Sequence, residues 1–224
     1  MKTVSMSRIG FRILRSAQDM FKDGSGIAAT EFAVIVPIML VMFFGTVEFS
    51  SGVAVDRKVT LISRTLSDLT AQTPSSSSQA QFATATDVSL QNNFTSSIAI
   101  IQPYCATPTL AQVSEIYVDS TGAATIQWSK ASTISSCAAA QATLSASTRN
   151  PGDVVTNLIP AALLVKQTYI IWSEVSYLYK PTIGYVMAPA GVNLSDVAFS
   201  RPRQVACVVY NSLPVITNGN CPST

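Results

Sequence analysis

The sequence predicts an α+β protein, in which a single N-terminal transmembrane helix extends into the periplasm and is followed by an antiparallel-sheet domain. Two observations support this class. An almost uncharged run extends from Ile27 to Val47, and β-branched and aromatic residues recur between Glu115 and Tyr210 in patterns typical of strands. The 224 residues have room for one membrane segment and one globular domain of ordinary size.

The apolar run has the length of a membrane span. Ile27 to Val47 would form a helix of roughly 31 Å, and Glu31 is its one charged residue. A carboxylate costs about 2.5–3.5 kcal/mol at the centre of such a segment and less toward an end, so Glu31 needs a reason to be there. A secretory signal peptide cut near Ala54 is disfavoured, because apolar cores of signal peptides have only about 7–15 residues. A plain signal anchor remains an alternative.

Charge predicts the orientation of this segment. Residues 1–26 carry five basic and two acidic side chains, whereas the remaining 198 residues carry nine basic and ten acidic ones. By the positive-inside rule the leader stays in the cytoplasm and the chain after the span is exported. No basic surface for nucleic acid is indicated.

The junction between the leader and the span resembles a known signal. It reads Gly26-Ile27-Ala28-Ala29-Thr30-Glu31-Phe32. This arrangement resembles the class III signal of type IV prepilins and pseudopilins, in which a membrane-embedded aspartyl peptidase cuts after the glycine. In that family the glutamate at the fifth mature position pairs with the free N-terminus of a neighbouring subunit. The resemblance implies a processing site at Gly26 and Ile27, and assembly roles for Glu31 and Phe32.

A narrower resemblance covers residues 24–72. Residues 28–37, and then Gly45-Thr46-Val47-Glu48-Phe49, are similar to the TadE/TadG-like group of the tight-adherence pilus machinery. The resemblance returns more briefly in Ser173–Pro181 and Arg201–Arg203. It implies the plan of type IV pilins, a long N-terminal helix followed by an antiparallel sheet.

The sequence divides into four parts. Residues 1–26 form a basic cytoplasmic leader, 27–48 the transmembrane segment, 49–72 a periplasmic continuation of the helix, and 73–224 the exported α+β domain. Helical spacing of apolar residues predicts that the helix reaches Ala71, with a kink at Pro37. Its apolar stripe packs either on its own globular domain or on another subunit, and the sequence leaves both open. The stripe consists of Val53, Val59, Ile62, Leu66 and Leu69.

The exported part predicts several short elements. Thr73–Gln79 is expected to be a linker, residues 80–95 are polar and ambiguous with a possible short helix, and a hairpin is expected from Glu115 through Gly122 to Trp128. Residues 131–148 are expected to be a pinned loop with a possible short helix, and a further short helix is expected from Asp153 to Leu158. Dense apolar residues predict a strand at Thr168–Tyr179, residues 183–200 are expected to be a loop, and another strand is expected at Gln204–Tyr210.

The four cysteines lie on the exported side, at Cys105, Cys137, Cys207 and Cys221. They form no C-x-x-C pair and the chain has no histidine, so neither a metal site nor a redox motif is predicted. An even number in an oxidising compartment favours two disulfides. Three pairings are possible, and proximity in sequence favours Cys105–Cys137 and Cys207–Cys221.

The sequence offers little support for catalysis. Without histidine, Ser-His-Asp and Cys-His systems are excluded, and no phosphate-binding glycine loop occurs. We therefore expect no enzyme activity, no cofactor and no small-molecule substrate. Arg201-Pro202-Arg203 could bind an anionic partner or form an exposed turn before a strand. Tyr177 and Tyr179 share one strand face and are interpreted as packing residues.

The resemblance implies a structural role. The expected function is that of a minor pseudopilin-like component of a tight-adherence pilus or a related secretion machine, in the inner membrane. Its expected partners are prepilin peptidase and other pilins or assembly proteins. The alternative is an unprocessed, membrane-anchored periplasmic binding module.

Overall fold

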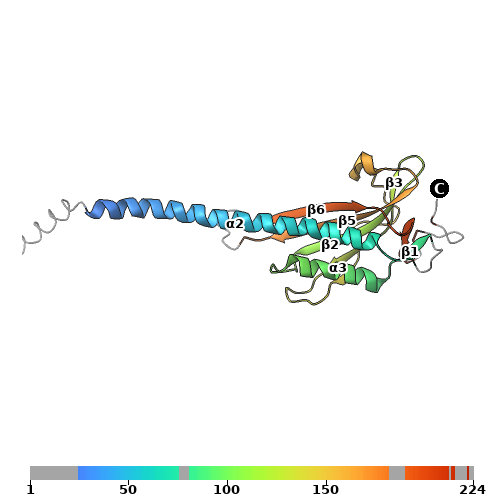
Figure 1. Cartoon of the computed structure of the whole chain (residues 1–224), viewed down its shortest axis with the longest axis horizontal. Helices are drawn as coiled ribbons and strands as arrows, with labels where there is room; N and C mark the ends of the chain where they lie inside the picture. The colour runs from blue at the N-terminus through green and yellow to red at the C-terminus, as the bar shows by residue number, and fades with distance from the viewer. Residues whose placement is uncertain (1–24, 76–80, 182–189, 212, 215–220, 222–224) are drawn as a thin grey trace, which may run out of the picture. The chain divides into compact units, whose positions relative to one another are not determined.

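The computed structural model describes residues 25–75, 81–181, 190–211, 213–214 and 221. The chain forms two compact units, of which the first ends at Glu48 and the second runs from Phe49 to Thr224. One helix, α2 (Ser25–Ala71), contributes to both (Figure 1). The sequence predicts this helix from Ile27 to Ala71, so the observed start is two residues earlier. An α+β arrangement of one long N-terminal helix and an antiparallel sheet domain is confirmed.

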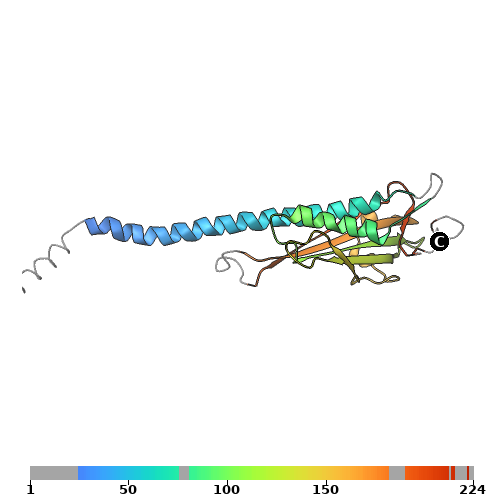
Figure 2. The same ribbon diagram turned by 90° about the horizontal axis from the view of Figure 1, so that it is seen from below.

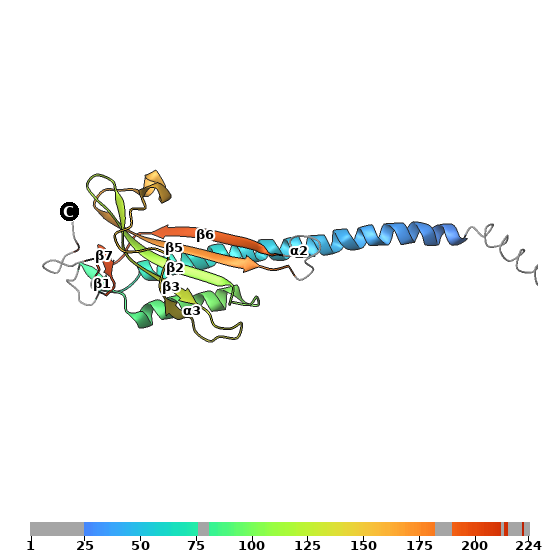
Figure 3. The same ribbon diagram turned by 180° about the vertical axis from the view of Figure 1, so that it is seen from behind.

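The second unit is built on a five-stranded antiparallel sheet in the order β4-β3-β2-β5-β6. Its strands are β2 (Thr109–Val118), β3 (Ala124–Thr133), β4 (Thr143–Ser145), β5 (Thr168–Tyr179) and β6 (Val192–Ser200). A separate pair of parallel strands joins β1 (Phe82–Thr84) to β7 (Cys207–Val209). Figure 3 shows the sheet from the face that looks away from the helices.

The part of α2 after Glu48 packs beside α3 (Asp87–Ile101) on one face of the sheet (Figure 2). Val59, Ile62 and Leu66 of the predicted stripe are completely buried in this core, whereas Val53 and Leu69 are 37% and 36% exposed. The buried part of the stripe therefore packs on its own domain. Trp128, Phe94 and Ile171 are among the largest side chains in the same core.

A smaller core covers part of the opposite sheet face. It joins Ile116, Ile126 and Trp172 to Val155 and Ile159 from the connection between β4 and β5. That connection contains two short 3₁₀ helices, η1 (Thr156–Leu158) and η2 (Ala161–Leu163). Sheet residues nearer the start of β2 have no such cover, and Leu110 is 61% exposed there.

The helix considered possible within residues 80–95 is present as the start of α3, which ends only at Ile101 and begins with a capping box between Thr86 and Ser89; β1 precedes it. Three other predictions of local structure are wrong in part. The loop expected at 183–200 ends in a strand, β6. Residues 131–148 include the end of β3 and all of β4, so they are not simply a loop. The last strand is shorter than predicted, Cys207–Val209, and lies outside the main sheet.

Candidate functional site

The residues implied for processing lie in the first turn of α2. Gly26 and Ile27 are exposed, and a side chain added at Gly26 would meet no atom within 4 Å. Thr30 Oγ1 donates a hydrogen bond to the Ile27 carbonyl oxygen at 2.8 Å. No other described residue packs against Gly26, so the start of the helix is accessible to another protein.

Glu31 and Phe32 follow on the same helix. Both are exposed, Phe32 to 68%, and Glu31 makes no ion pair with any residue in the described ranges. Ile27 and Glu31 are four positions apart, so they occupy one face of the helix. This places a carboxylate and the proposed new N-terminus on the same side.

The helix from Gly26 is long and apolar enough to cross a membrane. Its most apolar window has a mean hydropathy of 2.3, and none of that window is buried inside the protein. The apolar side chains exposed to more than half of their area include Val34, Ile38, Met39 and Phe43. A surface of this kind is stable only in an apolar environment such as lipid or a helix bundle.

The four cysteines form two disulfides, Cys105–Cys137 and Cys207–Cys221. Their Cα atoms are 4.5 and 6.0 Å apart, within the usual range for disulfides. The first bond ties the loop after α3 to the segment between β3 and β4. The second ties β7 to the chain near its C-terminus. These are the two sequential pairs.

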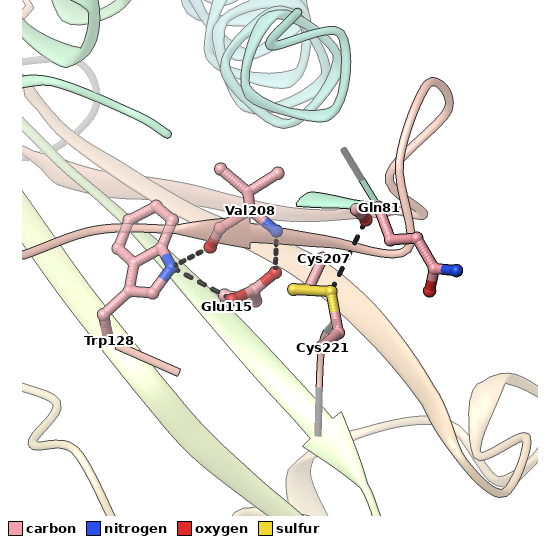
Figure 4. The surroundings of a disulfide bond; sticks show 6 residues. All are labelled: Gln81, Glu115, Trp128, Cys207, Val208 and Cys221. Atoms are coloured by element: carbon pink, nitrogen blue, oxygen red, sulfur yellow. Dashed lines mark hydrogen bonds between the residues drawn. A yellow bond between two sulfur atoms is a disulfide. The ribbon is translucent and has the colours of Figure 1, made fainter. Parts of the chain in front are cut away.

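A buried carboxyl group that the sequence analysis missed lies beside the second disulfide (Figure 4). Glu115 on β2 is fully buried and accepts hydrogen bonds from the backbone N–H of Val208 at 2.6 Å and from Trp128 Nε1 at 3.1 Å. The same indole N–H donates to the Val208 carbonyl oxygen at 2.7 Å. Glu115 and Trp128 thus bind both backbone polar groups of the central residue of β7.

Burial raises the pKa of the Glu115 carboxyl well above its usual value, while the hydrogen bonds from Val208 and Trp128 act to lower it. Burial also raises the pKa of Tyr169, and the Glu115 charge adds to that effect. A perturbed carboxyl can indicate catalysis. Here no histidine or metal cluster accompanies it among the described residues, and its contacts are structural. The sequence does contain a signal for this buried carboxyl group, because Glu115 is a charged residue at an inward position of the predicted hairpin.

The basic group Arg201-Pro202-Arg203 is used within the domain. Arg203 forms an ion pair with Asp68 of α2, and its backbone N–H donates to the Ala71 carbonyl oxygen at 2.9 Å. Arg201 and Pro202 have no regular secondary structure. The structure agrees with an exposed turn that precedes a strand. Tyr177 and Tyr179 are each 5% exposed and belong to the main core, as packing residues do.

The uncovered part of the outer sheet face contains a groove of about 460 Å³. Gln112 and Glu174 lie on its lining, and Arg149 binds both oxygens of Glu174 at 3.1 and 2.7 Å. Gln112 also accepts hydrogen bonds from Ser147 and Thr148. These polar groups are occupied by one another, so they hold the chain after β4 against the sheet.

Comparison with known protein families finds a match in one region of the chain. Residues 26–65 match the family model described as TadE-like protein. The expected resemblance is confirmed there, and it is consistent with the TadE/TadG-like family of the tight-adherence pilus system. The match includes Gly26, Ile27, Glu31 and Phe32, and it ends within α2. No curated protein and no solved structure matches the chain.

Proposed function

We propose that this chain is a minor, pseudopilin-like structural component of a tight-adherence pilus or a related secretion machine. The observation that carries the proposal is the TadE-like match over residues 26–65, because it coincides with an exposed apolar helix that begins at Gly26. The 198 residues after Gly26 are far more than the very short major pilins of tight-adherence systems have, so a minor or assembly role fits better than a major one. A role in assembly, initiation or adhesion suits such a subunit.

In this proposal the protein crosses the inner membrane once, with residues 1–26 in the cytoplasm and the domain from residue 73 in the periplasm. The charge difference between the leader and the rest of the chain supports this orientation. The two disulfides suit an oxidising compartment. Its partners are the prepilin peptidase and other pilus subunits, and its role is not catalytic.

Leader cleavage tests the proposal directly. The mature protein, purified from a host that has the prepilin peptidase, is expected to begin at Ile27 on N-terminal sequencing. Gly26→Arg should block cleavage. The matched control is Gly24→Arg, which adds the same charge two residues upstream and should be processed normally. An intact leader on the wild-type protein would reject processing.

A second function is supported by the groove on the outer sheet face. An unprocessed, membrane-anchored binding module would bind its ligand in this groove, which has a volume of about 460 Å³ and lies on the sheet face away from the helices. Such a protein would retain residues 1–26 and would not need Glu31 for association with other subunits. N-terminal sequencing therefore separates the two functions.

A further inference from the structure

One end of the second unit combines tyrosine and lysine side chains around a pocket. The pocket has a volume of about 300 Å³. It is lined by Ser51 on α2, by Tyr104, by Tyr177 and Tyr179 at the end of β5, and by Lys180, which follows that strand. The Tyr177 hydroxyl donates to the Cys105 carbonyl oxygen at 3.0 Å, which fixes the ring in place. The first disulfide thus supports the wall of this pocket.

This end of the domain lies close in sequence to the apolar segment. Ser51 is three residues beyond Glu48, the first charge after the uncharged run. Three residues reach at most about 10–11 Å, even when fully extended. The next residue, Gly52, lies against Tyr179, because a Cβ atom there would be 3.7 Å from Tyr179 Cε1. If the apolar segment is in a membrane, the pocket is near the lipid headgroups.

The side chains at this end have the chemistry of a membrane interface. Tyr104 is half-buried, and tyrosine is enriched at the headgroup level, where its ring and hydroxyl meet apolar and wet surroundings. The Lys180 side chain is exposed and forms no ion pair with any residue that the structure describes. Leu178, which also lines the pocket, is 37% exposed. An ammonium group beside an exposed leucine suits a phosphate at the edge of a lipid layer.

We propose that this pocket binds the headgroup of an anionic phospholipid and docks the domain on the membrane from which it is anchored. Lys180 attracts the phosphate, the hydroxyl groups of Ser51 and Tyr104 offer hydrogen bonds, and Leu178 contacts the acyl boundary. Docking limits the directions in which the domain presents its outer sheet face. The proposal rests on the single-pass anchor of the proposed function.

Lipid proximity can be measured on the full chain in lipid nanodiscs. The described cysteines are all in disulfides, so a thiol-reactive fluorophore can be directed to one introduced cysteine. Gln102→Cys places it at the exposed end of α3, where Lys58 Nζ binds the carbonyl oxygens of Ile100 and Gln102. Val154→Cys, at a position 69% exposed, places it beside the far end of the sheet, bridged to Thr125.

We expect a headgroup-labelled quencher lipid to quench the fluorophore on Gln102→Cys more strongly than the one on Val154→Cys when the discs contain phosphatidylglycerol. Lys180→Glu should lower the ratio of docked to undocked domain by about fivefold or more, whereas Lys180→Arg should preserve it. Lys166→Glu makes the same charge change at an exposed lysine outside the pocket and should have little effect.

Equal quenching at the two positions would overturn the proposal. So would the same result in phosphatidylcholine discs, or equal effects of Lys180→Glu and Lys166→Glu. Incorporation into discs is scored separately by size-exclusion chromatography. A chain that fails to incorporate contradicts the membrane anchor itself, whereas a chain that incorporates without selective quenching contradicts only the headgroup site.

Discussion

The Glu115 carboxylate accepts the backbone N–H of Val208 at 2.6 Å, across 93 residues of sequence. This bond lies inside the core and connects the main sheet to β7, which is part of the separate two-stranded sheet. A buried carboxyl with a raised pKa makes stability depend on pH.

Stability is expected to fall as pH rises from acid toward neutral and alkaline values. The pKa of Glu115 is raised in the folded state, so its contribution is fully present below the unfolded value of 4.5 and is lost as pH passes the folded pKa. Denaturant unfolding of the wild-type chain, measured from pH 4 to pH 9, should show this decline. Glu115→Gln cannot ionise and should flatten it. An equal pH dependence in both proteins would contradict the assignment to Glu115.

Trp128→Phe is expected to destabilise the domain more than Trp172→Phe. Both changes remove the same volume from buried positions. Trp128 Nε1 donates to Glu115 and Val208, whereas Trp172 Nε1 has no hydrogen-bond partner among the residues that the structure describes. Loss of the Trp128 donor leaves buried acceptors unsatisfied, at a cost of about 1–3 kcal/mol. The difference in free energy of unfolding between the two variants measures this cost. Equal destabilisation would show that ring volume alone matters.

Peptide mapping under non-reducing conditions should find Cys105 joined to Cys137 and Cys207 joined to Cys221, with no alkylated thiol. Replacing the first pair with alanine should cost about 3–4 kcal/mol in the chain-entropy treatment. The second pair closes a shorter loop, with a separation of 14 residues rather than 32, so its removal should cost less by up to about 1 kcal/mol. A mixed set of linked peptides would reject this pairing.

Glu31→Ala is expected to preserve membrane insertion and leader cleavage but to reduce association with other pilus subunits. A carboxylate and a free N-terminus about 4 Å apart attract by roughly 4 kcal/mol at an effective dielectric of 20. This attraction is comparable to the cost of about 2.5–3.5 kcal/mol for a carboxylate at the centre of a membrane segment.

Co-purification from membranes measures this association. The control is Thr30→Ala, which alters the neighbouring exposed residue and removes only its hydrogen bond to the Ile27 carbonyl oxygen. Wild-type recovery of partner subunits with Glu31→Ala would reject the pairing mechanism.

The parts of the fold that sequence predicts well have strong local patterns. The sequence predicts the strand Thr168–Tyr179 with its observed bounds, because its dense apolar residues indicate burial on both faces. The sequence does not predict the edge strand β6, because polar Asn193, Ser195 and Asp196 interrupt its apolar residues. Backbone hydrogen bonds to β5 hold this segment in the sheet. Local pattern cannot report that kind of pairing.

The processing and assembly residues were found from a motif, whereas the Glu115 contacts were not. Gly26 and Glu31 are five residues apart, so a short sequence motif contains both. Glu115, Trp128 and Val208 come from three separate strands, and only the folded sheet brings them together. A long-range hydrogen bond of this kind depends on which distant strands lie side by side, and local patterns in the sequence do not report that.

The parallel pairing of β1 with β7 sets the order in which the domain can be completed. β1 follows α2 closely, but its partner β7 (Cys207–Val209) lies far later in the sequence, after all five strands of the main sheet. Until those residues join the domain, the edge of β1 that β7 covers is open, and Glu115 has no backbone donor from Val208. A chain that lacks residues 207–209 would therefore keep an unsatisfied acid in its core and an open strand edge, and open strand edges favour aggregation.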